Sequence, residues 1–522
     1  MNPTKLKLLF HTVKYLRWEQ IYYRIYYGLR NRFFKKDYRK PLPKPLEKTH
    51  WDSPIHYKNS YLNQHRFSFL NLSHDFGEQL DWNCAYYGKL WTYNLNYFDF
   101  LLQQKIDKDD AIYLINNYID AYGKSKDGKE PYPTSLRGIN WIKFLSLHHI
   151  EDPKIDQNLY DQYQLLTHNL EYHLLGNHLL ENGFSLLFAA YYFDDEGFFR
   201  KAKKIIMGEL QEQIHLDGGH FELSPMYHKI LTHRLLDCIQ LMRLNPLKFK
   251  NQSLKLSVFA EAMCSWLAQM TFANGDIPLF NDSAKNSAVS SDELLKYAKS
   301  LGLNCEKKAL SDSGYRRFEH TDLELITDVG QVGPSYQPGH AHADTLGFVL
   351  YLYNRPFIID PGISTYEICP QRSLERSTKF HNTVTPLNEA NSSQVWSGFR
   401  VAKRARVQIL YDEPKYLMAE HHGFAQVHQR SFSCRDNNLV ITDYLANSQA
   451  KAYFHLAPGI EPTLVVNKDR VRCDTVNLCF SANEGIHIET YQCPDGYNRF
   501  KTAKKIVVLF NENLITTLEL DA

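Results

Sequence analysis

The segment GNHLLENG, residues 176–183, carries three polar side chains at helical spacing within an apolar run. On a helix, Asn177 lies four residues before Glu181 and His178 lies three residues before it, so the three groups share one side. A polar triad inside an apolar helix costs stability unless its members are hydrogen-bonded or functional. The segment therefore predicts either a functional group or a satisfied polar network between helices.

A second segment, DGGHFELSPMYHKI at residues 217–230, places a tyrosine beside a histidine where a helix begins. The Gly-Gly turn and the Ser224-Pro225 start signal put Tyr227 and His228 in the first helical turn. A lone tyrosine usually belongs to a core. A tyrosine beside a histidine after a glycine-rich loop is better placed for proton transfer.

The sharpest cluster is PGHAHADTLGF, residues 338–348. His340, His342 and Asp344 occupy alternating positions entering a strand, so their side chains project to one face. Three polar groups directly before the apolar run GFVLYLY are hard to explain as packing. This spacing predicts a catalytic or metal-binding site.

Two more candidates stand at strand ends, Asp360 in FIIDPG and His381 in KFHNTV. One carboxylate with two imidazoles suits a divalent ion, most simply Zn²⁺. The HxH pattern also occurs in metal-dependent amidohydrolases. Those enzymes carry the HxH pattern near the start of the chain, followed by parallel βα units. Here the pattern lies within a segment that is predicted to form antiparallel strands.

The chain divides into three parts that must position these residues. Residues 1–48 form a basic amphipathic segment, and residues 49–300 show helical periodicity, which predicts helical hairpins wound into a toroid or a bundle. Residues 310–522 consist of short alternating or β-branched runs, which predicts an antiparallel β-sandwich. Such a pair of domains usually has a cleft between them, where ligand sites concentrate.

The basic charge of the chain is local. Its net charge is only +2, which excludes a general nucleic-acid-binding surface, yet residues 1–48 hold thirteen Lys or Arg. That segment is too interrupted by charge to span a bilayer and lacks the features of a signal peptide. We expect it to pack on the main domain or to contact a membrane surface peripherally.

Nine cysteines, with no CxxC pair and an odd count, favour free thiols over a disulfide framework. With no visible export signal, the expected location is cytoplasmic or membrane-peripheral, with a periplasmic or secreted protein as the alternative. The sequence gives no indication of the oligomeric state.

Taken in order, these segments resemble the heparinase II/III-like polysaccharide lyases, especially members encoded with exopolysaccharide biosynthesis. The resemblance covers roughly residues 80–440 and implies an (α/α) toroid followed by an antiparallel β-sandwich. The motifs that carry it are WTYNLNYFDFL, PYPTSLRGINWIKF, NHLLENGFSLLFAAYYF, DGGHFELSPMYHKIL, GHAHADTLGF, DPGISTYE, HNTV and QVWSGFRVAKRAR.

The resemblance implies cleavage of a uronate-containing polysaccharide by β-elimination. Such a reaction needs a group that neutralises the uronate carboxylate, a base for the C5 proton and an acid for the departing O4. By resemblance Asn177 neutralises the carboxylate, with His178 and Glu181 beside it. Tyr227 is the acid, or both base and acid, and His340 is the base for the opposite face of the sugar.

The same resemblance matches His342, Asp360 and His381 to metal ligands that brace the β-domain, which implies a structural divalent ion, first of all zinc. Arg137 and Asn140 in SLRGINW are expected to hold substrate carboxylate or hydroxyl groups, because Arg reads a carboxylate in a bidentate way.

Two other functions stay open. An inverting glycoside hydrolase on the same toroid would use carboxyl groups such as Glu181, Glu222 or Asp282. A non-catalytic glycan-binding component of a polysaccharide assembly system, docked to a membrane by residues 1–48, would bind glycan without turnover.

Overall fold

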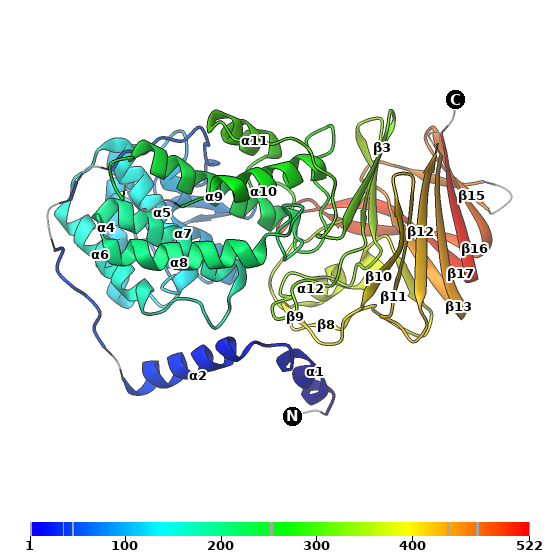
Figure 1. Ribbon diagram of the computed structural model, residues 1–522, viewed down its shortest axis with the longest axis horizontal. Coiled ribbons are helices and arrows are strands. Elements are labelled where there is room, and N and C mark those ends of the chain that lie inside the picture. The colour runs from blue at the N-terminus through cyan, green and yellow to red at the C-terminus, as the bar shows by residue number, and fades with distance from the viewer. Residues whose placement is uncertain are drawn as a thin grey trace.

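The computed structural model describes residues 3–34, 36–43, 46–47, 49–249, 254–435, 438–465 and 469–520. Helices form the first large domain and strands the second, and the change falls between Ser300 and Tyr315. Figure 1 shows the two domains side by side, with the N-terminal helices below their junction. The predicted fold class, a helical toroid followed by an antiparallel β-sandwich, is confirmed.

The helical domain is built around α7, whose residues are buried along almost their whole length because it packs against α5, α8 and α9. Aspartate or serine caps open α4, α6, α8 and α9 by accepting bonds from free backbone N–H groups. The helices are α3 (Lys89–Tyr97), α4 (Lys108–Ala121), α5 (Pro131–His148), α6 (Pro153–Thr167), α7 (Gly176–Phe193), α8 (Glu196–Gln213), α9 (Pro225–Leu244), α10 (Ser257–Met270) and α11 (Ser291–Ser300), preceded by a hairpin of β1 (Arg66–Phe69) and β2 (Leu72–Asp75).

The described residues of the β-domain form two large antiparallel sheets and one two-stranded hairpin. The smaller sheet has the order β3-β4-β5-β6, and the larger has the order β10-β11-β12-β13-β17-β16-β15-β14 with β7 beside β13. The strands are β3 (Tyr315–His320), β4 (Leu323–Asp328), β5 (Phe348–Leu352), β6 (Arg355–Ile358), β7 (Val384–Pro386), β10 (Val407–Glu413), β11 (Tyr416–His421), β12 (His428–Arg435), β13 (Asn438–His455), β14 (Pro462–Leu464), β15 (Arg470–Cys473), β16 (Val476–Pro494) and β17 (Phe500–Leu520).

The smaller sheet is covered on both faces, which explains why β4 and β5 are buried at every residue. Leu325 and Leu350 point into the core shared with the larger sheet. Ile326 and Val349 point the other way and pack with Trp266 of α10. Side chains that point alternately to the two faces of each strand thus pack against the larger sheet on one side and against the helical domain on the other.

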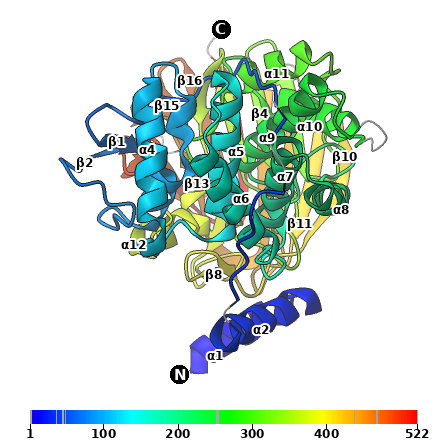
Figure 2. The same ribbon diagram turned by 90° about the vertical axis from the view of Figure 1, so that its left-hand side faces the viewer.

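Two helices at the N-terminus, α1 (Pro3–Val13) and α2 (Trp18–Phe33), lie outside both domains and contact each of them (Figures 1 and 2). The Thr12 hydroxyl accepts a bond from the Trp396 indole, 3.1 Å away, in the small hairpin β8 (Val395–Trp396) and β9 (Arg400–Val401). Arg17 pairs with Glu212 at the end of α8. In the described parts of the chain, no helix is long and apolar enough to cross a membrane.

Candidate active site

A cleft of about 1560 Å³ runs between the helical domain and the β-domain, bordered by α1 and α2. Asn177, His178, Tyr227 and His340 all line it. Four of the residues singled out from the sequence are therefore brought to one cavity, although they are up to 163 positions apart in the chain.

Asn177 stands at the strained start of α7. Leu175, two residues earlier, has φ 63° and ψ −156°, a backbone conformation that residues other than glycine rarely adopt. Gly176 has φ +60°, and a Cβ there would lie 2.2 Å from Gln337 Oε1 and 2.8 Å from Glu222 Oε1. Backbone strain of this kind persists only where the surrounding structure enforces it. Here the strained backbone before Asn177 directs the Asn177 amide into the cleft.

Glu222 anchors Asn177. The Asn177 side-chain amide donates to Glu222 Oε2 at 2.8 Å, and its backbone N–H donates to Oε1 at 3.2 Å. The same amide nitrogen lies 3.4 Å from His340 Nε2. Asn177 Oδ1 has no hydrogen-bond partner among the described residues. The amide is thus held rigidly beside the imidazole.

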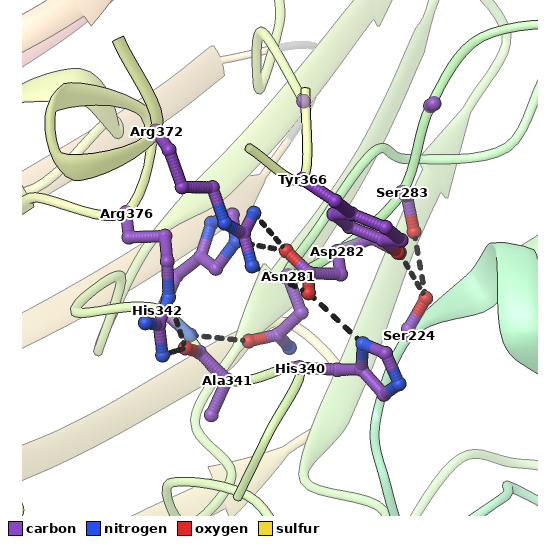
Figure 3. Close-up of polar contacts among 12 residues, drawn as sticks. Ser224, Asn281, Asp282, Ser283, His340, Ala341, His342, Tyr366, Arg372 and Arg376 are labelled. Carbon is purple, nitrogen blue, oxygen red and sulfur yellow. Dashed lines mark hydrogen bonds and ion pairs between the residues drawn. The ribbon is translucent and has the colours of Figure 1, made fainter. Parts of the chain in front are cut away.

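His340 is oriented by a buried carboxylate (Figure 3). Its Nδ1 lies 2.9 Å from Asp282 Oδ2, which fixes the imidazole with Nε2 toward the cleft and Asn177. A carboxylate on one imidazole nitrogen leaves the other free to accept a proton, as a general base requires.

Asp282 is itself held by Arg372 from α12 (Pro370–Glu375) and by His342. Arg372 donates to both oxygens of the carboxylate, at 2.7 Å for Oδ2, and His342 Nε2 lies 2.8 Å from Oδ1. Burial alone would raise the pKa of Asp282, but Arg372 and the two histidines hold it well below its usual range. Asp282 is therefore a permanent anion that positions His340.

Tyr227 lies in the first turn of α9, which Ser224 caps by accepting from the Tyr227 backbone N–H. Its ring packs against His340, tilted by 31° with 3.9 Å between ring centroids, and its hydroxyl lies 3.1 Å from the Tyr366 hydroxyl. Burial raises the pKa of Tyr227 well above its ordinary value, so the phenol keeps its proton. A protonated phenol over the imidazole is placed to act as an acid.

His178 and Glu181 flank the site in different ways. His178 lines the cleft and its Nδ1 lies 3.1 Å from Glu171 Oε1; burial lowers its pKa, but the charge of Glu171 outweighs this and raises it overall. Glu181 is fully buried and pairs at 2.8 Å with Arg234, whose side chain lines the cleft. Glu181 thus holds a cleft-lining cation, Arg234, that the sequence pattern did not reveal.

The structure does not bring Arg137 and Asn140, which are predicted to hold substrate, to the cleft. Both are fully buried within α5, away from the cleft lining. Arg137 donates to the carbonyls of Asn96 and Gly128 and to Gln162, and Asn140 donates to the carbonyl of Tyr97. Their donors are used to join helices and loops of the toroid.

We expect Arg137→Met to lower the free energy of unfolding by at least about 3 kcal/mol, because it leaves buried carbonyl groups without donors. The KM of any active substrate should stay unchanged. Denaturant unfolding checks the first expectation, with Arg200→Met on the exposed side of α8 as control. A stable variant with a raised KM would restore the substrate role.

The predicted metal ligands lie near one another. His342 and His381 each have one ring nitrogen bound to a carboxylate and the other without a hydrogen-bond partner among the described residues. His381 Nδ1 lies 2.7 Å from Asp360 Oδ2, and the rings of His342 and His381 are 5.2 Å apart. Among the described residues, no group of three or more His, Cys, Asp or Glu is arranged to hold a metal ion. The donor types suit zinc, whereas the observed arrangement does not assemble them around one point.

The cleft is electropositive. Among its described lining residues Lys and Arg outnumber Asp and Glu, and the cations include Arg24, Lys229, Arg234, Arg400, Arg404 and Lys501. Such a cleft concentrates polyanions.

Comparison with known proteins places this geometry in a family. Residues 136–306 match the model "Heparinase II/III N-terminus", and residues 304–519 match "Heparinase II/III-like, C-terminal". A heparin-sulfate lyase of Bacteroides stercoris is 27% identical over 311 residues, which are 53% of this chain and 45% of that protein. A heparin-sulfate lyase of Pedobacter heparinus is 29% identical over 255 residues, 43% of this chain and 38% of that protein.

The alignments thus span less than half the length of these curated relatives. Among solved structures, a heparinase III superposes with a TM-score of 0.65 at 17% identity, covering 82% of this chain and 77% of that one, which shows a shared fold. Because the two family models match consecutive segments from residue 136 to residue 519, the chain belongs to the heparinase II/III-like family.

Proposed function

We propose that this protein is a polysaccharide lyase that cleaves a uronate-containing polysaccharide by β-elimination. The observation that carries the proposal is the contact of three side chains in one electropositive cleft: the Asn177 amide, the His340 imidazole held by Asp282, and the Tyr227 phenol. The two sequence relatives are heparin-sulfate lyases, an activity of the same chemical class.

The proposed reaction assigns each group a step. Asn177 donates to the uronate carboxylate, which lets the C5–H bond release its proton and leave the electron pair as a stabilised enolate. Because the Tyr227 phenol keeps its own proton, His340 Nε2 takes the C5 proton. The C4–O4 bond then breaks as the C4–C5 double bond forms, and Tyr227 protonates O4. Arg234 adds a cation within the cleft for the charged substrate.

The arrangement weighs against the hydrolase alternative. An inverting hydrolase needs one carboxylic acid and one free carboxylate facing each other across the sugar. Asp282 is locked by Arg372 and two histidines, Glu222 is bound to Asn177, and Glu181 is buried against Arg234. None of the three presents a free carboxyl group to the cleft.

The decisive experiment is an ultraviolet absorbance screen of the purified protein on uronate-bearing polysaccharides, including the host's own exopolysaccharide. Elimination creates an unsaturated uronate that absorbs, whereas hydrolysis yields new reducing ends without absorbance. Turnover of an exopolysaccharide or capsule polymer would support the more specific role in exopolysaccharide metabolism that we propose. Tight binding without either product would favour the glycan-binding component.

We also propose a structural divalent ion, zinc first, beside this site, with His342, Asp360 and His381 as its ligands. Its support is that His342 Nδ1, His381 Nε2 and Asp344 Oδ2 are buried with no hydrogen-bond partner among the described residues. Such atoms cost stability unless something binds them. When bound, the ion would neutralise buried carboxylate charge and brace the β-domain; no proton transfer depends on it.

Elemental analysis of protein purified without a His tag checks this proposal. We expect about one zinc per chain, lost in His342→Ala and retained in His320→Ala, whose histidine is exposed on β3. A wild-type protein that is metal-free and still melts as one stable species would refute it.

A further inference from the structure

An exposed apolar stripe runs along α1 and α2. Its α2 members follow one another at intervals of four, three, one, three and four residues, which places them on one helical face. Trp18 is 74% exposed, Phe10 67% and Phe33 63%. The exposed members are Leu6, Phe10 and Val13 of α1 and Trp18, Tyr22, Ile25, Tyr26, Leu29 and Phe33 of α2.

The opposite face of α2 fixes which way the stripe points. Gln20 donates to the Leu174 carbonyl, and the Tyr27 hydroxyl donates to the Leu170 carbonyl at 2.8 Å. Tyr23 stacks on Tyr172 with 4.7 Å between ring centroids. The polar and half-buried side of the helix is therefore the one attached to the protein. An apolar face turned away from the protein is the reverse of ordinary packing and marks an interaction surface.

Positive charge is concentrated in the segment that carries the stripe. The described residues from Lys5 to Lys40 include ten Lys or Arg against only Glu19 and Asp37. A pocket of about 600 Å³ between α2 and the helical domain is lined by Arg24, Arg30, Lys36 and Lys129, and its described lining contains no Asp or Glu. Cations together with an aromatic and aliphatic face suit a partner whose interior is apolar and whose outer groups are anionic.

We infer that α1 and α2 dock this protein on an anionic lipid bilayer, with both helices lying in the membrane plane and the stripe inserted at the headgroup–acyl boundary. Trp18, Tyr22 and Tyr26 are of the residue types that favour that boundary, where one end of the ring is apolar and the other is wet. Cationic side chains next to an inserted apolar face are the pattern of interfacial helices. The inference does not depend on the proposed lyase activity.

Docking would also fix where the cleft lies. The same two helices contribute Leu9, Gln20 and Arg24 to the cleft lining, and the contacts Thr12–Trp396 and Arg17–Glu212 attach this part of the chain to both domains. A bilayer bound to their outer face holds the cleft mouth at the membrane surface. The polymer that the protein meets would then be one that is present at that surface.

Vesicle flotation of the full chain tests the inference, with phosphatidylglycerol–phosphatidylcholine vesicles compared with pure phosphatidylcholine. We expect binding to the anionic vesicles that weakens with salt, and a loss of at least tenfold in the triple variant Ile25→Gln, Leu29→Gln, Phe33→Gln. A matched control, Leu216→Gln, Leu247→Gln, Val258→Gln, removes equally exposed apolar side chains elsewhere and should bind like wild type.

A second measurement uses the fluorescence of the wild-type protein, with the conservative variant Trp18→Phe as its control. Trp18 is far more exposed than the buried Trp51, Trp82, Trp91, Trp141 and Trp266. Brominated lipids should therefore quench part of the fluorescence, and Trp18→Phe should remove that part. Three results would overturn the inference: no binding to anionic vesicles, a triple variant that binds like wild type, or a wild-type dimer that the triple variant dissolves, which would show a second copy on the stripe.

Discussion

Tyr227→Phe is expected to lower the rate of elimination by about 10²–10⁴-fold, the usual cost of losing a positioned acid or base. The substitution removes one oxygen, whose described contact is the Tyr366 hydroxyl at 3.1 Å, and keeps the ring that packs against His340. The free energy of unfolding should fall by only about 0.5–1.5 kcal/mol, the net worth of one hydrogen bond. Steady-state turnover and thermal melting together measure this separation between activity and stability.

Tyr366→Phe is the matched control because it breaks the same hydrogen bond from the other end. The two variants should lose similar stability, yet only Tyr227→Phe removes the acid. If Tyr227→Phe keeps more than about half of wild-type activity on a verified substrate, Tyr227 is not the acid, and the proposed mechanism fails with it.

The sequence was informative where chemistry sits inside one short segment. Asn177, Tyr227 and His340 each stand out against a helix start or a strand entrance, and the fold brings all three to the cleft. Their meeting point could not be predicted from spacing, since it depends on how α7, α9 and the loop before β5 pack together. The change from helical to strand periodicity predicted the two domains for a similar reason, because each pattern repeats over many residues.

The residues that support these three could not be assigned from the sequence. Arg372 lies 90 positions from Asp282 and carries no local pattern, and Glu222 meets Asn177 only through tertiary packing. The position of Arg137 outside the cleft lining could not be predicted, because α5 is buried from Pro133 to Ser146 and its sequence shows no distinct polar face. A buried arginine and an arginine that lines a cleft cannot be told apart from the sequence. Only their hydrogen-bond partners in the structure distinguish them.

Asp282→Asn is expected to lower kcat more than any other substitution outside Asn177, Tyr227 and His340. Asp282 touches no substrate position; it holds His340 Nδ1 at 2.9 Å and so sets which imidazole nitrogen is free. An amide can present its NH₂ to Nδ1 and reverse that choice, and loss of the correct tautomer in a comparable His–Asp pair costs about 10⁴-fold in kcat. KM should change little, because the cleft cations are untouched.

Stability must be separated from positioning here, since the variant leaves the buried Arg372 guanidinium without its carboxylate. Removing one partner of a buried ion pair typically costs about 3–5 kcal/mol. The double variant Asp282→Asn, Arg372→Met removes both charges and should recover part of the melting temperature without recovering kcat. A double variant that regains both would show that Asp282 serves the fold alone. A stable double variant with a low kcat and an unchanged KM would show that the Asp282 carboxylate acts through His340. In that variant the fold is restored, but His340 is still not held in the orientation that a base requires.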